Sequence, residues 1–284
     1  YSKEVFGLTP TAEFPTTLRK NSRFLQYCSG TLGDRWSEGK NILDVGGYDV
    51  LNAFDLKYAR GVICDPNAPD NYLRENLSIC KNFFSREWFD KGEFDFVIAK
   101  HIIEHINDLG KFMDDVSHVL KEGAVLILET PELSGNLKEG CYALFYHQHL
   151  MYFDAFSLEN VVRKFGFTVI DKTIDNGNLR LVARKLGEKT SKKISYEKDP
   201  VVPEKLKDYR SALDRYLKQA ELFLEESCRE ERCICYGAGG GTTLLFHLNP
   251  RLKDLVERVV DSSVNKIGKK IGGTSFIIKD PAVL

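Results

Sequence analysis

Hydrophobic patterning from about residue 40 alternates short apolar runs with segments of helical period. The apolar runs predict strands at 41–45, 61–65, 77–80, 94–99 and 124–129. A helix is predicted over 109–121, because apolar residues recur there at helical spacing. This alternation is typical of βαβ units around a parallel sheet. We therefore expect a doubly wound, mostly parallel α/β sheet.

An antiparallel hairpin is expected to close this sheet. Ser157 can cap the start of a helix that Gly166 ends. Two β-rich runs follow at 168–170 and 179–183, and Asp175-Asn-Gly177 between them is a strong signal for a tight turn.

A second, smaller Rossmann-like α/β unit is expected near the end of the chain. Strands are predicted to start at Cys233 and to run over 256–261 and 275–278. The expected domains are an N-terminal helical lead at 1–36, a main domain at 37–186, a linker with a connecting helix at 187–231, and the small unit at 232–284.

Composition narrows the class of protein. The 284 residues include 43% hydrophobic and 29% charged side chains, which suits a chain that buries a core. Forty Lys and Arg residues against 41 Asp and Glu residues give a net charge of -1, so nothing attracts the chain as a whole to nucleic acid. Neither a secretory leader nor an apolar run of membrane-spanning length is visible. We expect a cytoplasmic protein.

The seven cysteines point to a reducing compartment rather than to a disulfide framework. Cys64, Cys80, Cys233 and Cys235 lie in apolar, strand-like runs, where reduced buried thiols are common. Only one residue separates Cys233 from Cys235, a spacing that matches neither a redox pair nor a zinc knuckle. No metal is assigned from the sequence.

A glycine pair directly follows the first predicted strand, in Asp44-Val-Gly-Gly47. Such a loop lets the backbone approach a ligand at the carboxyl end of a strand. Asp65 ends the next strand about 20 residues later, where a carboxylate can accept both ribose hydroxyls of an adenosine. The spacing suits a nucleoside cofactor, although a glycine pair by itself also fits a tight packing turn.

Four motifs in order resemble the series found in class I S-adenosylmethionine-dependent methyltransferases. They are Asp44-x-Gly46, Asp65, the run 94–105 that ends in Ile-Ile-Glu-His, and the run 120–131. The resemblance implies S-adenosylmethionine as cofactor. It places Gly46 and Gly47 at the methionine portion, Asp65 at the ribose, Asn82 and Phe83 at the adenine, and Asp44 and Lys100 in the same cofactor site.

Tyrosine and histidine are concentrated in the segment 141–153. Histidine titrates near neutrality and tyrosine can orient an oxygen, which suits the deprotonation of a weakly acidic nucleophile. His149 is the preferred general base, with Tyr146 and His105 as further catalytic candidates. Two alternatives stay open: His149 could instead donate to a backbone carbonyl and pin the following helix, and His105 could be a structural anchor.

More narrowly, Tyr146-His-Gln-His149 resembles the Tyr-His-Glu-His segment of sugar C-methyltransferases. The resemblance implies a nucleotide-linked sugar as acceptor and places His147 and Gln148 at the substrate. Gln148 stands where that family has an acid, so a mechanism that uses this carboxylate cannot be carried over.

A second glycine loop, Tyr236-Gly-Ala-Gly-Gly-Gly-Thr242, resembles a dinucleotide fingerprint, and Asp261 follows about 20 residues later. Three interpretations are open: a packing unit, a substrate phosphate or nucleotide site, or an NAD site. Gly237, Gly239 and Thr242 are the candidates for substrate binding, because amides and hydroxyls at a helix N-terminus suit an anion.

The function expected from these features is C- or O-methyl transfer from S-adenosylmethionine to a small polar acceptor, such as a nucleotide-linked sugar. An NAD(P)-dependent oxidoreductase and a non-catalytic nucleotide-binding module are the alternatives. The expected partner is a small-molecule substrate, and neither nucleic acid nor a membrane is expected to bind.

Overall fold

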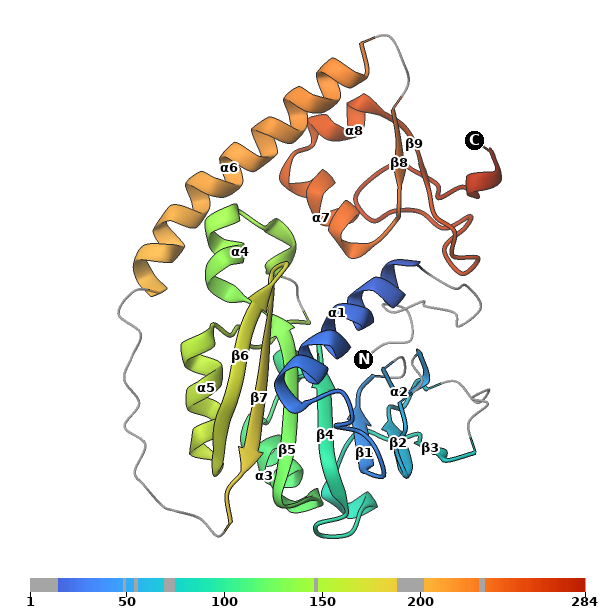
Figure 1. The fold of residues 1–284 in the computed structure, drawn as a ribbon. Coiled ribbons are helices and arrows are strands. Elements are labelled where there is room, and N and C mark those ends of the chain that lie inside the picture. Colours follow the sequence, from blue (N-terminus) through green and yellow to red (C-terminus); the bar gives the residue numbers. More distant parts are fainter. Residues whose placement is uncertain are drawn as a thin grey trace. The chain divides into compact units, whose positions relative to one another are not determined.

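The computed structural model describes residues 15–47, 50–53, 56–68, 75–145, 148–187, 202–229 and 233–283 (Figure 1). These residues divide into two compact units. The first, here the sheet unit, consists of the described residues of Glu13–Leu133 and His147–Pro200. The second, here the carboxyl-terminal unit, contains those of Ser134–Tyr146 and Val201–Leu284. The four-segment division expected from the sequence stays a prediction.

The sheet unit is built on a seven-stranded sheet with the order β3-β2-β1-β4-β5-β7-β6 (Figure 1). Its strands are β1 (Asn41–Val45), β2 (Arg60–Cys64), β3 (Leu77–Cys80), β4 (Phe94–Lys100), β5 (Leu120–Pro131), β6 (Phe167–Asp175) and β7 (Asn178–Lys185). All pairings from β3 to β5 are parallel, whereas β7 runs antiparallel to both β5 and β6. The predicted fold class, a mostly parallel sheet with a terminal antiparallel hairpin, is confirmed.

Helices cover both faces of this sheet, so its strands bury side chains on each side. They are α1 (Pro15–Leu32), α2 (Val50–Ala53), α3 (Leu109–Val119) and α5 (Ala155–Lys164). Leu43 and Val97 pack in one core cluster with α3 and α5. Ile42 and Ile98 face the other way and pack in a second cluster with α1 and α2. Alternation along each strand therefore produces the two cores.

The turn and helix start near the hairpin follow local chemistry. Asn176 and Gly177 both have positive φ, at 50° and 74°, as a two-residue hairpin turn requires. Ser157, which we expected as the N-cap of α5, is instead the third helical residue. The cap is Asp154, whose carboxylate accepts from the Ser157 N–H at 2.8 Å, while the Ser157 hydroxyl accepts from the Asp154 N–H at 3.0 Å. This reciprocal capping box moves the helix start to Ala155.

The carboxyl-terminal unit contains a two-stranded parallel sheet. Its elements are α4 (Leu133–Glu139), α6 (Val202–Ser227), β8 (Cys233–Tyr236), α7 (Gly240–Leu248), α8 (Arg251–Leu255) and β9 (Val256–Val260). The third strand predicted at 275–278 is wrong, because only isolated bridges occur there within the described residues. The Thr274 hydroxyl accepts from the Phe276 N–H at 3.1 Å and so takes the donor that a strand pairing would need.

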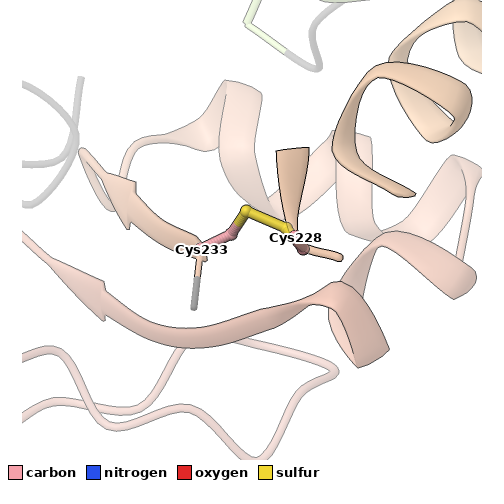
Figure 2. The surroundings of a disulfide bond; sticks show 2 residues. All are labelled: Cys228 and Cys233. Atoms are coloured by element: carbon pink, nitrogen blue, oxygen red, sulfur yellow. A yellow bond between two sulfur atoms is a disulfide. The ribbon is translucent and has the colours of Figure 1, made fainter. Parts of the chain in front are cut away.

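A disulfide joins Cys228, just beyond the end of α6, to Cys233, the first residue of β8 (Figure 2). The expectation that Cys233 is a reduced thiol is therefore wrong. Cys64 is a buried free thiol, as expected. Among the helices that the structure describes, none is both long and apolar enough to cross a membrane.

Candidate active site

The carboxyl ends of β1, β2 and β3 bring the predicted cofactor residues to one edge of the sheet. Val45 pairs with Cys64, and Cys64 pairs with Cys80, so the three strands end at the same level. The Asp65 N–H donates to the Cys80 carbonyl at 3.1 Å, and the Cys64 thiol donates to the Asn82 carbonyl at 3.5 Å. The glycine loop, Asp65 and Asn82 therefore follow three adjacent strands.

Neighbouring side chains lie too close to Gly46 and Gly47 for either position to carry a Cβ atom without a shift. Gly46 has a φ of 68°, and a Cβ atom there would lie 2.1 Å from Ile102 Cδ1. A Cβ atom on Gly47 would lie 2.8 Å from Oδ1 of Asp44, whose residue is fully buried. Both positions thus need glycine, and the loop presents its backbone rather than side chains at the strand end.

Asp65 carries a nearly buried carboxylate at the end of β2. The residue is 8% exposed, and burial raises its pKa. Its Oδ1 accepts from the Asn67 N–H at 2.6 Å, which holds the side chain in place. The following strand end presents apolar surface, because Phe83 is 63% exposed. A carboxylate and an exposed aromatic ring at neighbouring strand ends match the polar and apolar faces of an adenosine.

A second group of charged side chains lies at the ends of β4 and β5. His101 directly follows β4 and has a φ of 53°, which is uncommon for a residue other than glycine. Its Nδ1 lies 3.4 Å from Oε1 of Glu104, and its Nε2 lies 3.2 Å from Oε1 of Glu129. Burial alone would lower the pKa of His101, but the two carboxylates together raise it.

Glu129 is held by several cations at once. It is 2% exposed and pairs closely with Arg180, a residue of β7, while Lys100 Nζ lies 3.9 Å from its Oε1. Burial raises the pKa of Glu129, but His101, Arg180 and Lys100 lower it by more than burial raises it, so the net shift is downward. Arg180 also pairs with Asp175 at 3.0 Å. These contacts form a buried charge network beside the strand ends.

His105 is the last residue of the short helix η2 (Ile103–His105), and its ring lies next to that of His149. Nδ1 of His105 lies 2.8 Å from the Gln148 carbonyl, and the rings of His105 and His149 are 4.9 Å apart between centroids. The N–H groups of Leu150 and Met151 both donate to the Glu104 carbonyl. The segment after residue 147 is therefore tied to the residues that follow β4.

Glu104, His105 and His149 form the cluster at which acid–base chemistry can occur. Each offers one oxygen or nitrogen atom, and these atoms all lie within 4.8 Å of one another. Glu104 is 2% exposed, and its Oε2 accepts from the Thr130 hydroxyl at 3.0 Å. We refer to these three residues below as the Glu-His-His cluster.

The structure places most of the sequence-predicted site residues in the sheet unit. They are Asp44, Gly46, Gly47, Asp65, Asn82, Phe83, Lys100, His105, Gln148 and His149. Tyr146 and His147 lie outside the described residues, so their predicted roles are untested. The amide oxygen of Gln148 is buried and accepts no hydrogen bond within the described part of the chain.

Gly237, Gly239 and Thr242 belong to the carboxyl-terminal unit, where the second glycine loop is closed by its own contacts. The Thr242 hydroxyl donates to the Gly237 carbonyl at 2.6 Å. Oδ2 of Asp261 accepts from the Ala238 N–H at 2.8 Å and from Lys266 Nζ at 3.0 Å. The Thr242 hydroxyl and the Asp261 carboxylate, which a bound nucleotide would contact, thus already form hydrogen bonds with the backbone of the loop.

His101, Glu104, Glu129 and Arg180 are not among the site residues predicted from the sequence. Glu129 and Arg180 occupy runs that read as apolar strands, and only the register of β5 against β7 places them opposite each other. The signal that could have found Glu129 is its position, because a charged residue at the carboxyl end of a buried parallel strand faces the usual ligand side of such a sheet.

A doubly wound sheet with a glycine loop, a buried aspartate and an acid–base cluster at its carboxyl edge defines an α/β enzyme that uses a nucleoside cofactor. Residues 15–172 match the methyltransferase domain family, and the chain belongs to that family. A comparison of the sequence with curated proteins gives no match.

The solved structures similar in fold include two methyltransferases and one methyltransferase complex. A protein in complex with the Trm112 methyltransferase activator of Haloferax volcanii is 14% identical, with 60% of this chain and 94% of that chain covered and a TM-score of 0.48. The 1,6-didemethyltoxoflavin-N1-methyltransferase of Burkholderia thailandensis, with bound 1,6-didemethyltoxoflavin and S-adenosylhomocysteine, is 18% identical, with 60% and 78% covered and a TM-score of 0.45. An S-adenosylmethionine-dependent methyltransferase of Methanosarcina mazei is 16% identical, with 52% and 93% covered and a TM-score of 0.40.

S-adenosylmethionine is the cofactor of this methyltransferase. The described residues fit it, because Gly46 and Gly47 place backbone without side chains after β1 and Asp65 holds a carboxylate at the next strand end.

Proposed function

We propose that this methyltransferase acts on a small polar acceptor, with a nucleotide-linked sugar as the substrate class. The observation that supports methyl transfer to a polar acceptor is the position of the Glu-His-His cluster. The Ile102 side chain packs against Gly46, and Glu104 and His105 lie two and three residues further along the chain. Groups that can move a proton therefore follow, within one short helix, a residue that packs against the loop that would hold the methionine end of the cofactor.

Each strand end would contribute to cofactor binding. Asp65 would accept hydrogen bonds from the ribose hydroxyls, and Asn82 with Phe83 would contact the adenine. The buried Asp44 and the backbone of Gly46 and Gly47 would hold the methionine portion. Lys100 would contribute a cation to the same site, although its amino group now lies 3.9 Å from Glu129.

The protein's part in the reaction is alignment and proton removal. The bound cofactor supplies an electrophilic methyl group on a sulfonium, so the acceptor must be held in line and must lose a proton. We assign proton removal to the Glu-His-His cluster, with His149 as the proton acceptor. His105 is the positioning residue, because the Gln148 carbonyl at 2.8 Å fixes its ring.

The substrate class rests on the resemblance of Tyr146-His-Gln-His149 to sugar C-methyltransferases. Gln148 is neutral, so it cannot supply the carboxylate of that family, and transfer to oxygen is as compatible with this site as transfer to carbon. For the oxidoreductase alternative, the described residues offer no supporting observation, because Asp261 is engaged by Ala238 and Lys266.

The test is transfer of a labelled methyl group from S-adenosylmethionine to a panel of nucleoside-diphosphate sugars, with release of S-adenosylhomocysteine measured in parallel. We expect label in at least one sugar nucleotide, and loss of transfer in the Asp65→Ala variant. Asp90→Ala, an exposed carboxylate outside the site, is the matched control. Cofactor binding without transfer to any member of the panel would overturn the substrate class.

A further inference from the structure

The Glu-His-His cluster has the composition of a metal site. Two imidazoles and one carboxylate place their ligand atoms within 4.8 Å of one another, and the carboxylate belongs to a residue that is 2% exposed. We propose that Glu104, His105 and His149 bind a single divalent transition-metal cation, of which Zn²⁺ is the best match.

Contacts around the cluster orient its side chains as metal ligands are usually oriented. Nδ1 of His105 lies 2.8 Å from the Gln148 carbonyl, so this nitrogen carries the proton and Nε2 keeps its lone pair. That Nε2 lies 3.9 Å from Oε1 of Glu104. Metal-binding histidines typically donate their other N–H in this way to a carbonyl or carboxylate.

Glu104 is fixed by a similar outer contact. Its Oε2 accepts from the Thr130 hydroxyl at 3.0 Å, which sets the plane of the carboxylate. Its Oε1 is buried and accepts no hydrogen bond of good geometry from the described residues. This oxygen lies 3.9 Å from Nε2 of His105, and a cation bound between the two side chains would contact both atoms.

The charge of Glu104 also favours a cation. Glu129, at the end of β5, has Arg180, Lys100 and His101 around it. Glu104 has only imidazole groups within ion-pair distance in the described residues, with His101 at 3.4 Å and His105 at 3.9 Å. His101 is shared between Glu104 and Glu129, so a bound cation would give the buried Glu104 carboxylate a counter-charge of its own.

The donor set selects the metal. Two imidazole nitrogens and one carboxylate oxygen suit Zn²⁺ and its neighbours, whereas Mg²⁺ and Ca²⁺ prefer oxygen ligands only. Ligand atoms around a tetrahedral zinc lie roughly 3.3 Å apart, as follows from metal–ligand distances near 2 Å. Side-chain rotations would bring the present separations, at most 4.8 Å, to that value. Three protein ligands leave one position open for an acceptor oxygen.

This inference rests on the proposed methyl transfer and changes the part that His149 plays in it. A cation lowers the pKa of a hydroxyl that it binds, so the acceptor hydroxyl loses its proton to solvent. The acceptor oxygen then forms its bond to the methyl carbon as the sulfur–carbon bond breaks, and neutral S-adenosylhomocysteine leaves. In the cation-bound protein His149 is a ligand, and its role as proton acceptor is confined to the cation-free protein.

The test is titration of the full chain with Co²⁺ after removal of metals by a chelator, followed by visible absorption and calorimetry. We expect one Co²⁺ per chain with the absorption bands of a nitrogen- and oxygen-bound ion. Glu104→Gln and His149→Asn should each weaken binding by at least about 100-fold, and Thr130→Val by about 10- to 100-fold. His118→Asn, a histidine of α3 outside the cluster, is the matched control and should bind as the wild type does.

Methyl transfer should slow in the chelated protein, where His149 has to act as the proton acceptor, and should return to the full rate with Zn²⁺ or Co²⁺. The metal site would be overturned if the wild-type chain bound no stoichiometric Co²⁺, or if Glu104→Gln and His149→Asn bound it as tightly as His118→Asn. Thermal unfolding of the chelated variants checks that each is folded. If Glu104→Gln or His149→Asn does not fold, the Co²⁺ affinity of Thr130→Val tests the site instead. Binding of S-adenosylmethionine without Co²⁺ binding overturns the metal site alone, whereas no S-adenosylmethionine binding with or without Co²⁺ overturns the proposed function.

Discussion

Replacing Gly46 by alanine tests how the loop after β1 is built. Two costs follow from the structure. The φ of 68° is a left-handed conformation, which costs an L-residue about 1 to 2 kcal/mol. The added Cβ would also lie 2.1 Å from Ile102 Cδ1 and 2.5 Å from Ile102 Cγ1, and overpacking of this kind costs about 1 to 3 kcal/mol. Together, Gly46→Ala should destabilise the sheet unit by roughly 2 to 5 kcal/mol.

Gly123→Ala is the matched control for the backbone part of this cost. Gly123 has a φ of 74°, and a Cβ atom there would meet nothing within 4 Å. Only the conformational cost of about 1 to 2 kcal/mol should appear. Ile102→Ala removes both atoms that the Gly46→Ala methyl would strike, so the double variant should be more stable than the sum of the two single effects predicts.

Thermal unfolding measures these differences, and a change of 1 kcal/mol corresponds to about 2 to 4 °C for a domain of this size. We expect Gly46→Ala to lower Tm by on the order of 10 °C and Gly123→Ala by about half of that or less. Equal losses in the two variants would refute the steric part of the argument. Strict additivity of Gly46→Ala and Ile102→Ala would show that the two residues do not compete for the same space.

Two further predictions concern buried charges. Arg180→Met should destabilise the chain by about 3 to 5 kcal/mol, because it leaves Glu129 without its closest partner. Adding Glu129→Gln should recover part of this loss in thermal unfolding, and no recovery would contradict the pairing of Arg180 with Glu129. Burial raises the pKa of Asp261, but hydrogen bonds from Ser263, Ala238 and Lys266 lower it by more. This carboxylate therefore stabilises the fold above its unfolded pKa of about 3.9 and loses that effect as pH falls through its folded pKa. The stability gap between wild type and Asp261→Asn should therefore be constant above about pH 5 and shrink below about pH 4, and a gap that widens in acid would contradict this assignment.

Much of the fold is predictable because its signals are local. The run 41–45 holds the apolar residues Ile42, Leu43 and Val45, and the structure has β1 there, since a strand covered by helices on both faces must bury both sets of side chains. Errors arose where a nearby polar group redirected the backbone. Thr274 took the N–H of Phe276 where a strand was expected, and Asp154 capped α5 three residues before Ser157.

The site residues likewise fall into those with a local signal in the sequence and those without one. Gly46 and Asp65 could be found because a strand followed by glycine and a strand followed by an acid are patterns visible within a few residues. Glu129 and Arg180 could not, because their pairing depends on the antiparallel register of β5 and β7, which joins positions 51 residues apart. His101 likewise gains its significance from two carboxylates, one of which lies on another strand.

We propose that S-adenosylmethionine binds at the carboxyl ends of β1 and β2 and that Asp65 holds its ribose. The direct measurement is calorimetric titration of S-adenosylmethionine into the wild type, Asp65→Ala and the control Asp90→Ala. We predict one molecule bound per chain, a loss of about 1 to 3 kcal/mol in Asp65→Ala, the scale of hydrogen bonds to a charged acceptor, and no change in Asp90→Ala. Undiminished affinity in a folded Asp65→Ala variant, or no binding by the wild type, would contradict the claim.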